Sequence, residues 1–194
     1  MDRTDPLADF DQGLLAAPRD QVSRRFIAAW LAWRRTGRLV PTRGEIELAD
    51  IKELLGRILL FELIGPDEIL VKVAGSQLRD LAAFEATGKN FAELTPPSQW
   101  PLRQWRMEQM VVRPCGGIMI TLGEGASGFG GTFETVTLPL APDAPGKPRL
   151  LMSNVAVVGG VYEPPAKDRP HTVPLADEFR FLDLGAGVPD RAVP

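Results

Sequence analysis

The stretch ITLGEGASGFGGTFETVTL, residues 120–138, contains the spacing Gly123-x-Gly125-x-x-Gly128 directly after a short apolar run. The same spacing occurs in dinucleotide-binding enzymes, where a helix begins at the last glycines and presents its amides and dipole to the pyrophosphate. Here Gly128 is followed by Phe129, two glycines and then TFETVTLPL, which has the pattern of a β-strand. Because no helix follows, the glycines predict a hairpin connection and not a nucleotide site.

Nucleophiles and metal ligands are sparse in this chain. Ser127 lacks the glycine at position 129 that a nucleophile elbow needs. The only histidine is His171, in a proline-rich segment, so a Ser–His or Cys–His pair would require that segment to fold back over the core. One Cys and one His cannot complete a typical zinc shell, and we expect no metal site. Cys115 is expected at a corner between a helix and a strand.

Carboxylates are the remaining candidates for catalysis. Glu62 and Glu134 lie within predicted strands, where charges usually face solvent, and no spacing singles them out. We expect no enzymatic activity. The alternative is a small α+β enzyme that uses these carboxylates, which would require them to be buried in a concave pocket with strongly raised pKa values.

Composition and charge limit the partners. The 194 residues are 44% hydrophobic, enough for one domain with extensions, and the formal net charge of −3 gives no reason to expect nucleic acid. A single cysteine excludes an internal disulfide, and the acidic, proline-containing start is not a signal peptide. No apolar run approaches the length of a membrane span, so we expect a cytoplasmic protein.

The pattern of apolar residues predicts an α+β domain over 20–160, between a flexible N-terminal arm (1–19) and a proline-rich C-terminal tail (161–194). Asp20 is expected to cap an amphipathic helix with Phe26, Trp30 and Trp33 on its apolar stripe. The other predicted elements follow in chain order: a short helix at 48–55, strands at 58–64 and 68–74, helices at 76–84 and 98–112, and strands at 117–122, 132–140 and 149–158. We read the late segment EFRFLDL as part of a docking tail.

These elements predict a five-stranded antiparallel sheet with short helices on one face and the N-terminal helix as an addition. Val136, Leu138 and Leu140 share one face of their strand, and both faces of the last strand look covered. The sheet therefore needs a second cover, which either the tryptophan helix or a second subunit could supply.

The element order and several short motifs resemble a family of small stand-alone bacterial PAS proteins, largely alphaproteobacterial and formerly a domain of unknown function. The resemblance covers about residues 20–158, with Leu48 and Lys72 where many members have proline and arginine. Its motifs are the following: Trp30-Leu-Ala-Trp33-Arg34, Pro41-Thr-Arg43, ADIKELLGRILLFEL, Lys72-Val-Ala-Gly75-Ser-Gln-Leu78, Thr87-Gly88-Lys-Asn-Phe91 and Leu138-Pro139-Leu140.

The resemblance implies a sensory or regulatory module without catalytic activity that acts by protein–protein interaction. A small organic ligand could gate it from a pocket between the sheet and the short helices. Haem needs an axial ligand, commonly histidine, and the core has none; the photoreactive flavin subclass needs a cysteine signature that ATGKNFAEL lacks. We therefore expect neither cofactor. The candidate pocket residues are Leu78, Phe84, Phe91, Trp105, Ile120, Val136 and Leu138.

The resemblance also implies output through flanking helices. A chain without an attached kinase or cyclase must pass its signal to a separate protein, and we expect a homodimer formed through Phe26, Trp30 and Trp33 of the N-terminal helix. Arg43 is expected to anchor the connector after that helix through a buried ion pair.

Overall fold

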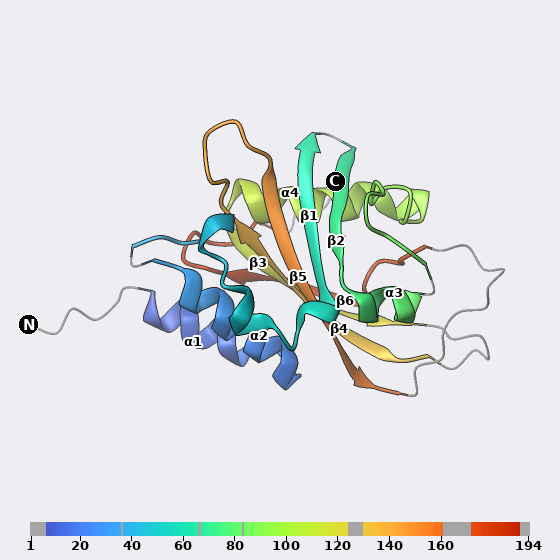
Figure 1. Cartoon of the computed structure of the whole chain (residues 1–194), viewed down its shortest axis with the longest axis horizontal. Coiled ribbons are helices and arrows are strands. Elements are labelled where there is room, and N and C mark those ends of the chain that lie inside the picture. Colours follow the sequence, from blue (N-terminus) through green and yellow to red (C-terminus); the bar gives the residue numbers. More distant parts are fainter. Residues whose placement is uncertain are drawn as a thin grey trace, which may run out of the picture.

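The computed structural model of the 194-residue chain describes residues 7–35, 37–65, 67–82, 84–123, 130–160 and 172–190. One antiparallel sheet with the strand order β2-β1-β5-β4-β3-β6 runs through it (Figure 1). Its strands are β1 (Ile58–Gly65), β2 (Glu68–Ala74), β3 (Cys115–Leu122), β4 (Thr132–Leu140), β5 (Arg149–Gly159) and β6 (Glu178–Asp183). The α-helices are α1 (Ala8–Ala16), α2 (Gln21–Trp33), α3 (Ser76–Ala82) and α4 (Trp100–Val112).

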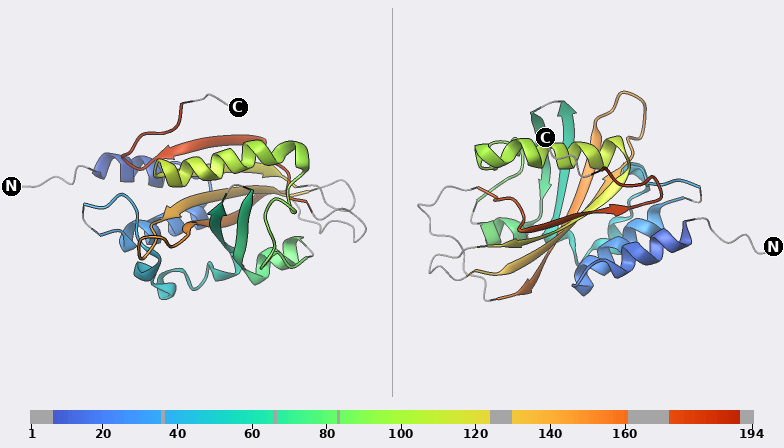
Figure 2. Two further views of the ribbon diagram at one scale, coloured as in Figure 1. Left: turned by 90° about the horizontal axis from the view of Figure 1, so that it is seen from above. Right: turned by 180° about the vertical axis from the view of Figure 1, so that it is seen from behind.

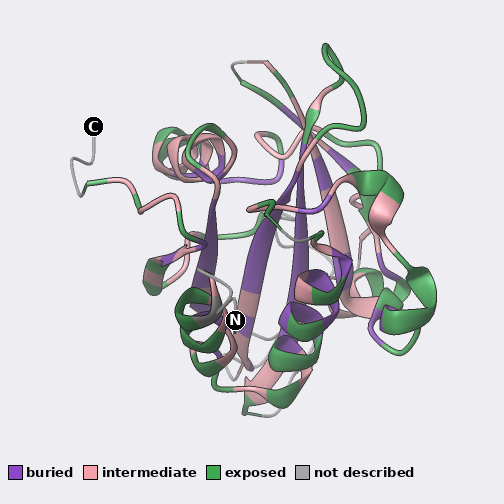
Figure 3. Ribbon diagram, turned by 90° about the vertical axis from the view of Figure 1, so that its left-hand side faces the viewer, coloured by how far each residue is buried: buried purple, intermediate pink, exposed green. Residues whose placement is uncertain are grey.

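Helix α2 is the second cover that the sheet needs. The Asp20 carboxylate accepts a hydrogen bond from the Val22 amide at 2.7 Å and so caps the helix as predicted. Phe26 and Trp30 are 0% exposed, and the Trp30 indole donates to the Pro139 carbonyl of β4 at 3.0 Å. The inner side of α2 and the strands beneath it form a continuous buried layer (Figure 3). The chain thus covers this face of the sheet, which we call the α2 face, with its own helix.

This packing leaves Phe26, Trp30 and Trp33 unavailable to a second subunit. All three are at most 5% exposed within one chain, and the Trp33 indole donates to Asp50 at 2.9 Å. A homodimer contact through these side chains is therefore not possible in this fold. The three side chains form an apolar stripe on α2 as predicted, but the stripe packs against the sheet of the same chain.

The N-terminal segment contains a helix that the sequence did not predict. Residues 8–16 form α1, whose Leu14 is only 3% exposed, in place of a flexible arm. An ion pair of 2.6 Å joins Asp11 of α1 to Arg34 at the end of α2. Helix α1 therefore belongs to the layer on the α2 face.

The C-terminal segment returns to the sheet. Residues 178–183, predicted as part of a docking tail, form β6, which pairs with β3 so that Phe181 lies opposite Gly117. The sheet thus has one strand more than predicted. Figure 2 shows β6 (red) lying close to α4. The tail therefore docks on its own domain.

The predicted strands and the hairpin of β1 and β2 are confirmed, as are the helices after Gly75 and before Cys115. The segment predicted as a helix at 48–55 instead forms 3₁₀ turns, η2 (Leu48–Ile51) and η3 (Leu55–Arg57). Strands β3 and β4 pair antiparallel, with Gly123 donating to the Gly131 carbonyl at 2.9 Å. This pairing excludes the parallel βαβ unit of a dinucleotide site; Gly125, Ser127 and Gly128 lie outside the described residues.

Candidate functional site: a cavity on the α4 face

Alternation along the central strands separates two chemically different faces. In β4, Val136 and Leu138 belong to the apolar cluster under α2, whereas Thr135 and Thr137 point the other way. In β5, Ser153 sits beside Thr137, and the two hydroxyls lie 2.7 Å apart. The face that α4 covers, which we call the α4 face, therefore has hydroxyl groups at its centre.

A cavity of about 710 Å³ lies on the α4 face, in the size range of small-molecule sites. Its floor is the sheet, and α3, α4, the segment 84–94 and the segment 172–176 line its other sides. The apolar part of its lining includes Phe61, Val71, Leu78, Leu81, Phe84, Phe91, Leu94, Met107, Met110, Met119, Phe133, Val155 and Phe179.

Three of the seven predicted pocket residues line this cavity: Leu78, Phe84 and Phe91. Val136 and Leu138 do not, because their face of β4 packs under α2. Ile120 borders a separate hollow of about 190 Å³ next to Glu134. Trp105 packs edge-on against Phe181 of β6, with ring centroids 5.8 Å apart, and lies outside the cavity lining.

Helix α4 contributes polar residues that the sequence reading missed. Arg103, Arg106, Met107 and Met110 follow the spacing of one helical face, and all four line the cavity. Arginines on a predicted helix usually lie on its solvated side. The signal that could have indicated this position is that the two arginines fall on the same helical face as Met107 and Met110.

Arg103 is 7% exposed and binds neutral oxygens. Its guanidinium donates to the Thr95 hydroxyl at 2.8 Å, to the Val173 carbonyl at 2.7 Å and to the Pro174 carbonyl. It also lies 4.9 Å from the centre of the Phe91 ring, within cation–π range. Burial, and to a smaller extent the nearby charge of Arg106, lowers the pKa of Arg103 to about 10, so the group stays protonated at neutral pH.

These hydrogen bonds hold residues 172–176, which we call the strap, as one wall of the cavity. The Val173 amide donates to the Leu94 carbonyl at 2.6 Å, and the Leu175 amide to the Gln99 side chain at 2.7 Å. The strap leads directly into β6. Arg103 therefore links the cavity lining to the strap, which in turn precedes the last strand.

The two candidate carboxylates do not form an acid–base pair. Glu62 makes an ion pair with Lys72 at 2.9 Å, and Glu134, 0% exposed, accepts from the amides of Arg19 and Asp20. Glu62 lies opposite Leu150 of β5 and Glu134 opposite Ala156, six residues further along, which separates them by roughly 20 Å. Neither lines the cavity.

Cys115 lies at the predicted helix-to-strand corner and is fully buried. Burial, together with the nearby charge of Asp183, raises the pKa of its thiol to about 12, so at neutral pH it is an unreactive thiol. It is not among the residues that line the cavity. His171 lies outside the described residues.

The described residues contain neither a candidate metal site nor a candidate membrane span. No three His, Cys, Asp or Glu side chains lie together as a metal site would need. No described helix is long and apolar enough to cross a membrane.

The predicted family-motif positions have structural roles. A side chain at Gly75 would approach the Gly56 carbonyl to 2.4 Å, and Gly88 has a φ of +82°. Pro41 is buried and its carbonyl accepts from the Ala141 amide at 2.8 Å. Arg43, however, is exposed and does not anchor the connector as predicted.

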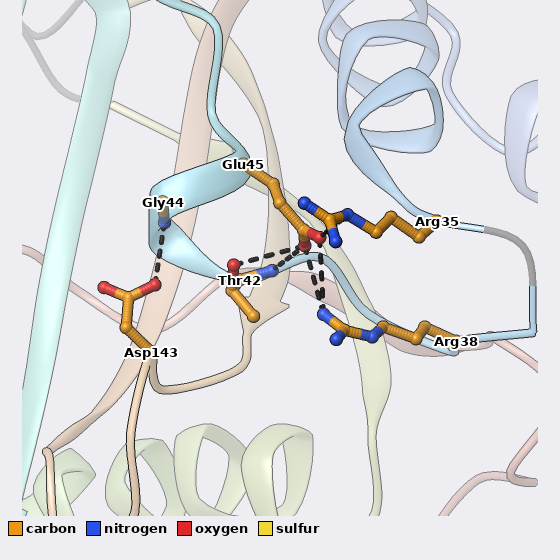
Figure 4. A network of polar contacts seen from close by, with 6 residues as sticks. All are labelled: Arg35, Arg38, Thr42, Gly44, Glu45 and Asp143. Atoms are coloured by element: carbon orange, nitrogen blue, oxygen red, sulfur yellow. Dashed lines mark hydrogen bonds and ion pairs between the residues drawn. The ribbon is translucent and has the colours of Figure 1, made fainter.

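The connector is held instead by Glu45 (Figure 4). Its carboxylate accepts from the Thr42 amide at 2.8 Å and pairs with Arg35 and Arg38. The amide of Gly44, the residue before Glu45, donates to Asp143 at 2.8 Å. This network ties the segment after α2 to the loop that follows β4, on the side of the sheet away from the cavity lining.

Comparison with solved structures gives PAS and LOV domains. A PAS domain from Colwellia psychrerythraea is 13% identical with a TM-score of 0.41, covering 57% of this chain and 96% of its own. A fungal LOV domain photoreceptor is 17% identical with a TM-score of 0.43, covering 75% and 97%. A LOV domain studied with a flavin analogue is 14% identical with a TM-score of 0.39, covering 58% and 84%.

The comparison with curated proteins gives no match. The comparison with protein families does: residues 19–153, more than half of the chain, match the PAS domain. This segment begins just before α2 and contains β1 to β4, α3, α4 and the first part of β5. The chain belongs to the PAS domain family.

Proposed function

We propose that this protein is a non-catalytic sensory or regulatory PAS module that acts by protein–protein interaction and is gated by a small organic ligand in the cavity. The observation that carries the proposal is the cavity itself: about 710 Å³, largely apolar, with a few polar groups converging on it from α4 and the sheet. This combination is typical of small-molecule sites.

The residues around the cavity favour binding over catalysis. Its polar side chains are arginines and hydroxyls, and no residue of its described lining is Asp, Glu, His or Cys. The ligand we propose is neither haem nor a photoreactive flavin, because the buried Cys115 thiol does not line the cavity and the described core offers no histidine.

The route to a partner runs through the strap. Arg103 contacts both the Phe91 ring in the cavity wall and the strap carbonyls, so a ligand that moves this guanidinium also moves the start of β6. We propose that a signalling protein reads this change on the surface formed by β6. A homodimer, if it forms, uses a surface other than the buried stripe of α2.

The test is to purify the protein natively, denature it and search the released fraction by mass spectrometry for a compound at about one equivalent. A stoichiometric compound whose re-addition raises the Tm of the emptied protein would support the proposal. A ligand at one hundred times its Kd stabilises the folded state by about 2.7 kcal/mol, which is easily measured. An empty preparation with no thermal shift across metabolite and lipid panels would contradict ligand gating.

A further inference from the structure

The lining of the cavity is positively charged, although the chain as a whole has a negative net charge. The chain has a formal net charge of −3, yet the residues that line the cavity include Arg79, Arg103 and Arg106 and, in the part of the chain that the structure describes, no acidic residue. Arg79 forms an ion pair with Glu85 at 3.6 Å. Neither Arg103 nor Arg106 has a carboxylate within ion-pairing distance among the described residues.

Arg106 is the more available of these two cations. Arg103 is engaged by the Thr95 hydroxyl and two strap carbonyls, whereas the described contact of the Arg106 guanidinium is with the face of the Phe179 ring, 4.1 Å from its centre. A cation–π contact leaves the N–H groups in the plane of the guanidinium free to donate.

The two guanidiniums also disfavour each other. They are three residues apart on α4, so they lie on the same side of the helix, and like charges at this spacing destabilise it. Partial burial lowers the pKa of Arg106, and the charge of Arg106 contributes to the lowered pKa of Arg103. An anion bound in the cavity beside the two guanidiniums would offset this repulsion. A guanidinium binds a carboxylate or phosphate through two parallel hydrogen bonds.

We infer that the ligand is an amphipathic anion: an apolar body in the cavity with a carboxylate or phosphate head group held by Arg106. The inference rests on the proposed ligand-gated function and specifies the ligand class. The apolar body would lie among Phe61, Leu78, Phe84, Met107 and Met110. Arg103, one turn away, adds to the positive field and connects the head group to the strap.

Four probes with the same ten-carbon chain test the head group on the full-length protein. Decanoate, decyl phosphate and decyltrimethylammonium are titrated calorimetrically below their micelle concentrations, and 1-decanol below its solubility limit. We expect at least one of the two anions to bind at least tenfold more tightly than the alcohol, and the cation more weakly still. Which anion is preferred distinguishes a fatty-acid-like ligand from a phosphate-headed one.

Variants then test the residue. Loss of a hydrogen bond to a charged group predicts that Arg106→Gln weakens the preferred anion roughly tenfold to a hundredfold while leaving 1-decanol unchanged. Arg106→Lys, which keeps the charge, should lose less. Arg25→Gln is the matched control, because it removes the same charge from an exposed ion pair on the α2 face.

Equal affinity of wild type for the anions and 1-decanol would overturn the inference, as would unchanged anion binding by a folded Arg106→Gln variant. If that variant does not fold, the comparison of head groups on the wild-type protein still decides. A neutral or cationic compound found at one equivalent in the native protein would refute the anion while the proposed ligand-gated function would stand. A native protein that contains no ligand, shows no thermal shift with any compound and binds none of the four probes would refute both.

Discussion

The two faces of the sheet use the same strands in opposite ways. On the α2 face, a thirteen-residue helix fills the space, and Phe26, Ile27 and Trp30 are completely buried. On the α4 face, the thirteen-residue α4, the seven-residue α3 and several loop segments leave a cavity of about 710 Å³ above the sheet. The α4 face has a buried cluster of its own, which includes Phe61 and Met110, but it is smaller than the cluster under α2. The α2 face therefore holds the larger part of the core, and the α4 face has the space for a ligand.

Trp30→Ala should cause the largest loss of stability on the α2 face. Replacing a fully buried tryptophan typically costs about 3–5 kcal/mol, and here the hydrogen bond to Pro139 is lost as well. Urea unfolding should show a loss of this size or a chain that no longer folds. The control, Leu78→Ala, trims a half-buried side chain that lines the cavity and should cost about 1 kcal/mol or less. Equal losses in the two variants would contradict the difference between the faces.

Arg103→Met tests how the cavity face is held together. The variant keeps an apolar stem but removes the donors to Val173 and Pro174, so the strap should open more often. We expect hydrogen exchange in residues 172–183 to accelerate about tenfold or more, since bonds from a charged donor contribute roughly 1.5–3 kcal/mol. Arg113→Met, which removes a bond to Val188 only, is the control. Unchanged exchange in the strap would exclude the link through Arg103.

Two neighbouring residues of β5, Ser153 and Asn154, point to opposite faces of the sheet and test the polar groups of each face. Asn154 is fully buried on the α2 face, and neither its side-chain nitrogen nor its oxygen has a hydrogen-bond partner among the described residues. Asn154→Leu should therefore raise the free energy of unfolding by about 1 kcal/mol. Ser153→Ala should lower it by a similar amount, since it leaves the buried Thr137 hydroxyl without its partner. Chemical unfolding measures both changes. A destabilised Asn154→Leu variant, or an unchanged Ser153→Ala variant, would contradict these hydrogen-bond assignments.

Glu45 should make a small contribution to the stability of the protein, and this contribution should depend on pH. Hydrogen bonds from Thr42, first that of its amide, and the charges of Arg35 and Arg38 lower the pKa of Glu45 below its usual 4.5. A carboxylate with a lowered folded-state pKa stabilises above its unfolded pKa, and this contribution is lost as the pH falls through the folded value. Glu45→Gln should thus slightly destabilise the protein at neutral pH and flatten its pH dependence below about 4.5. NMR titration of Glu45 would test this, and an unshifted midpoint would refute it.

Much of the architecture follows from strong local patterns. The apolar stripe of α2, its Asp20 cap and the alternation in β4 each predict an element that the structure confirms. Helix α1 was missed because ADFDQGLLA is short, carries a central glycine and buries little beyond Leu14. Strand β6 was missed because it follows a proline-rich stretch and its position depends on pairing with β3.

The site was less predictable because it depends on which face of each strand is already covered. The sequence shows that Val136 and Leu138 share a face but not that α2, rather than a ligand, occupies it. Threonines and a serine on the cavity floor look like solvent-facing residues of an ordinary strand. Arg106 likewise looks like a surface charge until α4 is placed over the cavity.

The return of the chain along β3 has a practical consequence for isolating the domain. The family match ends at residue 153, in the middle of β5, whereas the strap and β6 lie beyond it. A fragment trimmed to the match would lose half of a central strand, an edge strand and one wall of the cavity. Ligand screens on such a fragment would return false negatives, so binding experiments should retain the chain through at least Leu184, which packs in the core at 1% exposure.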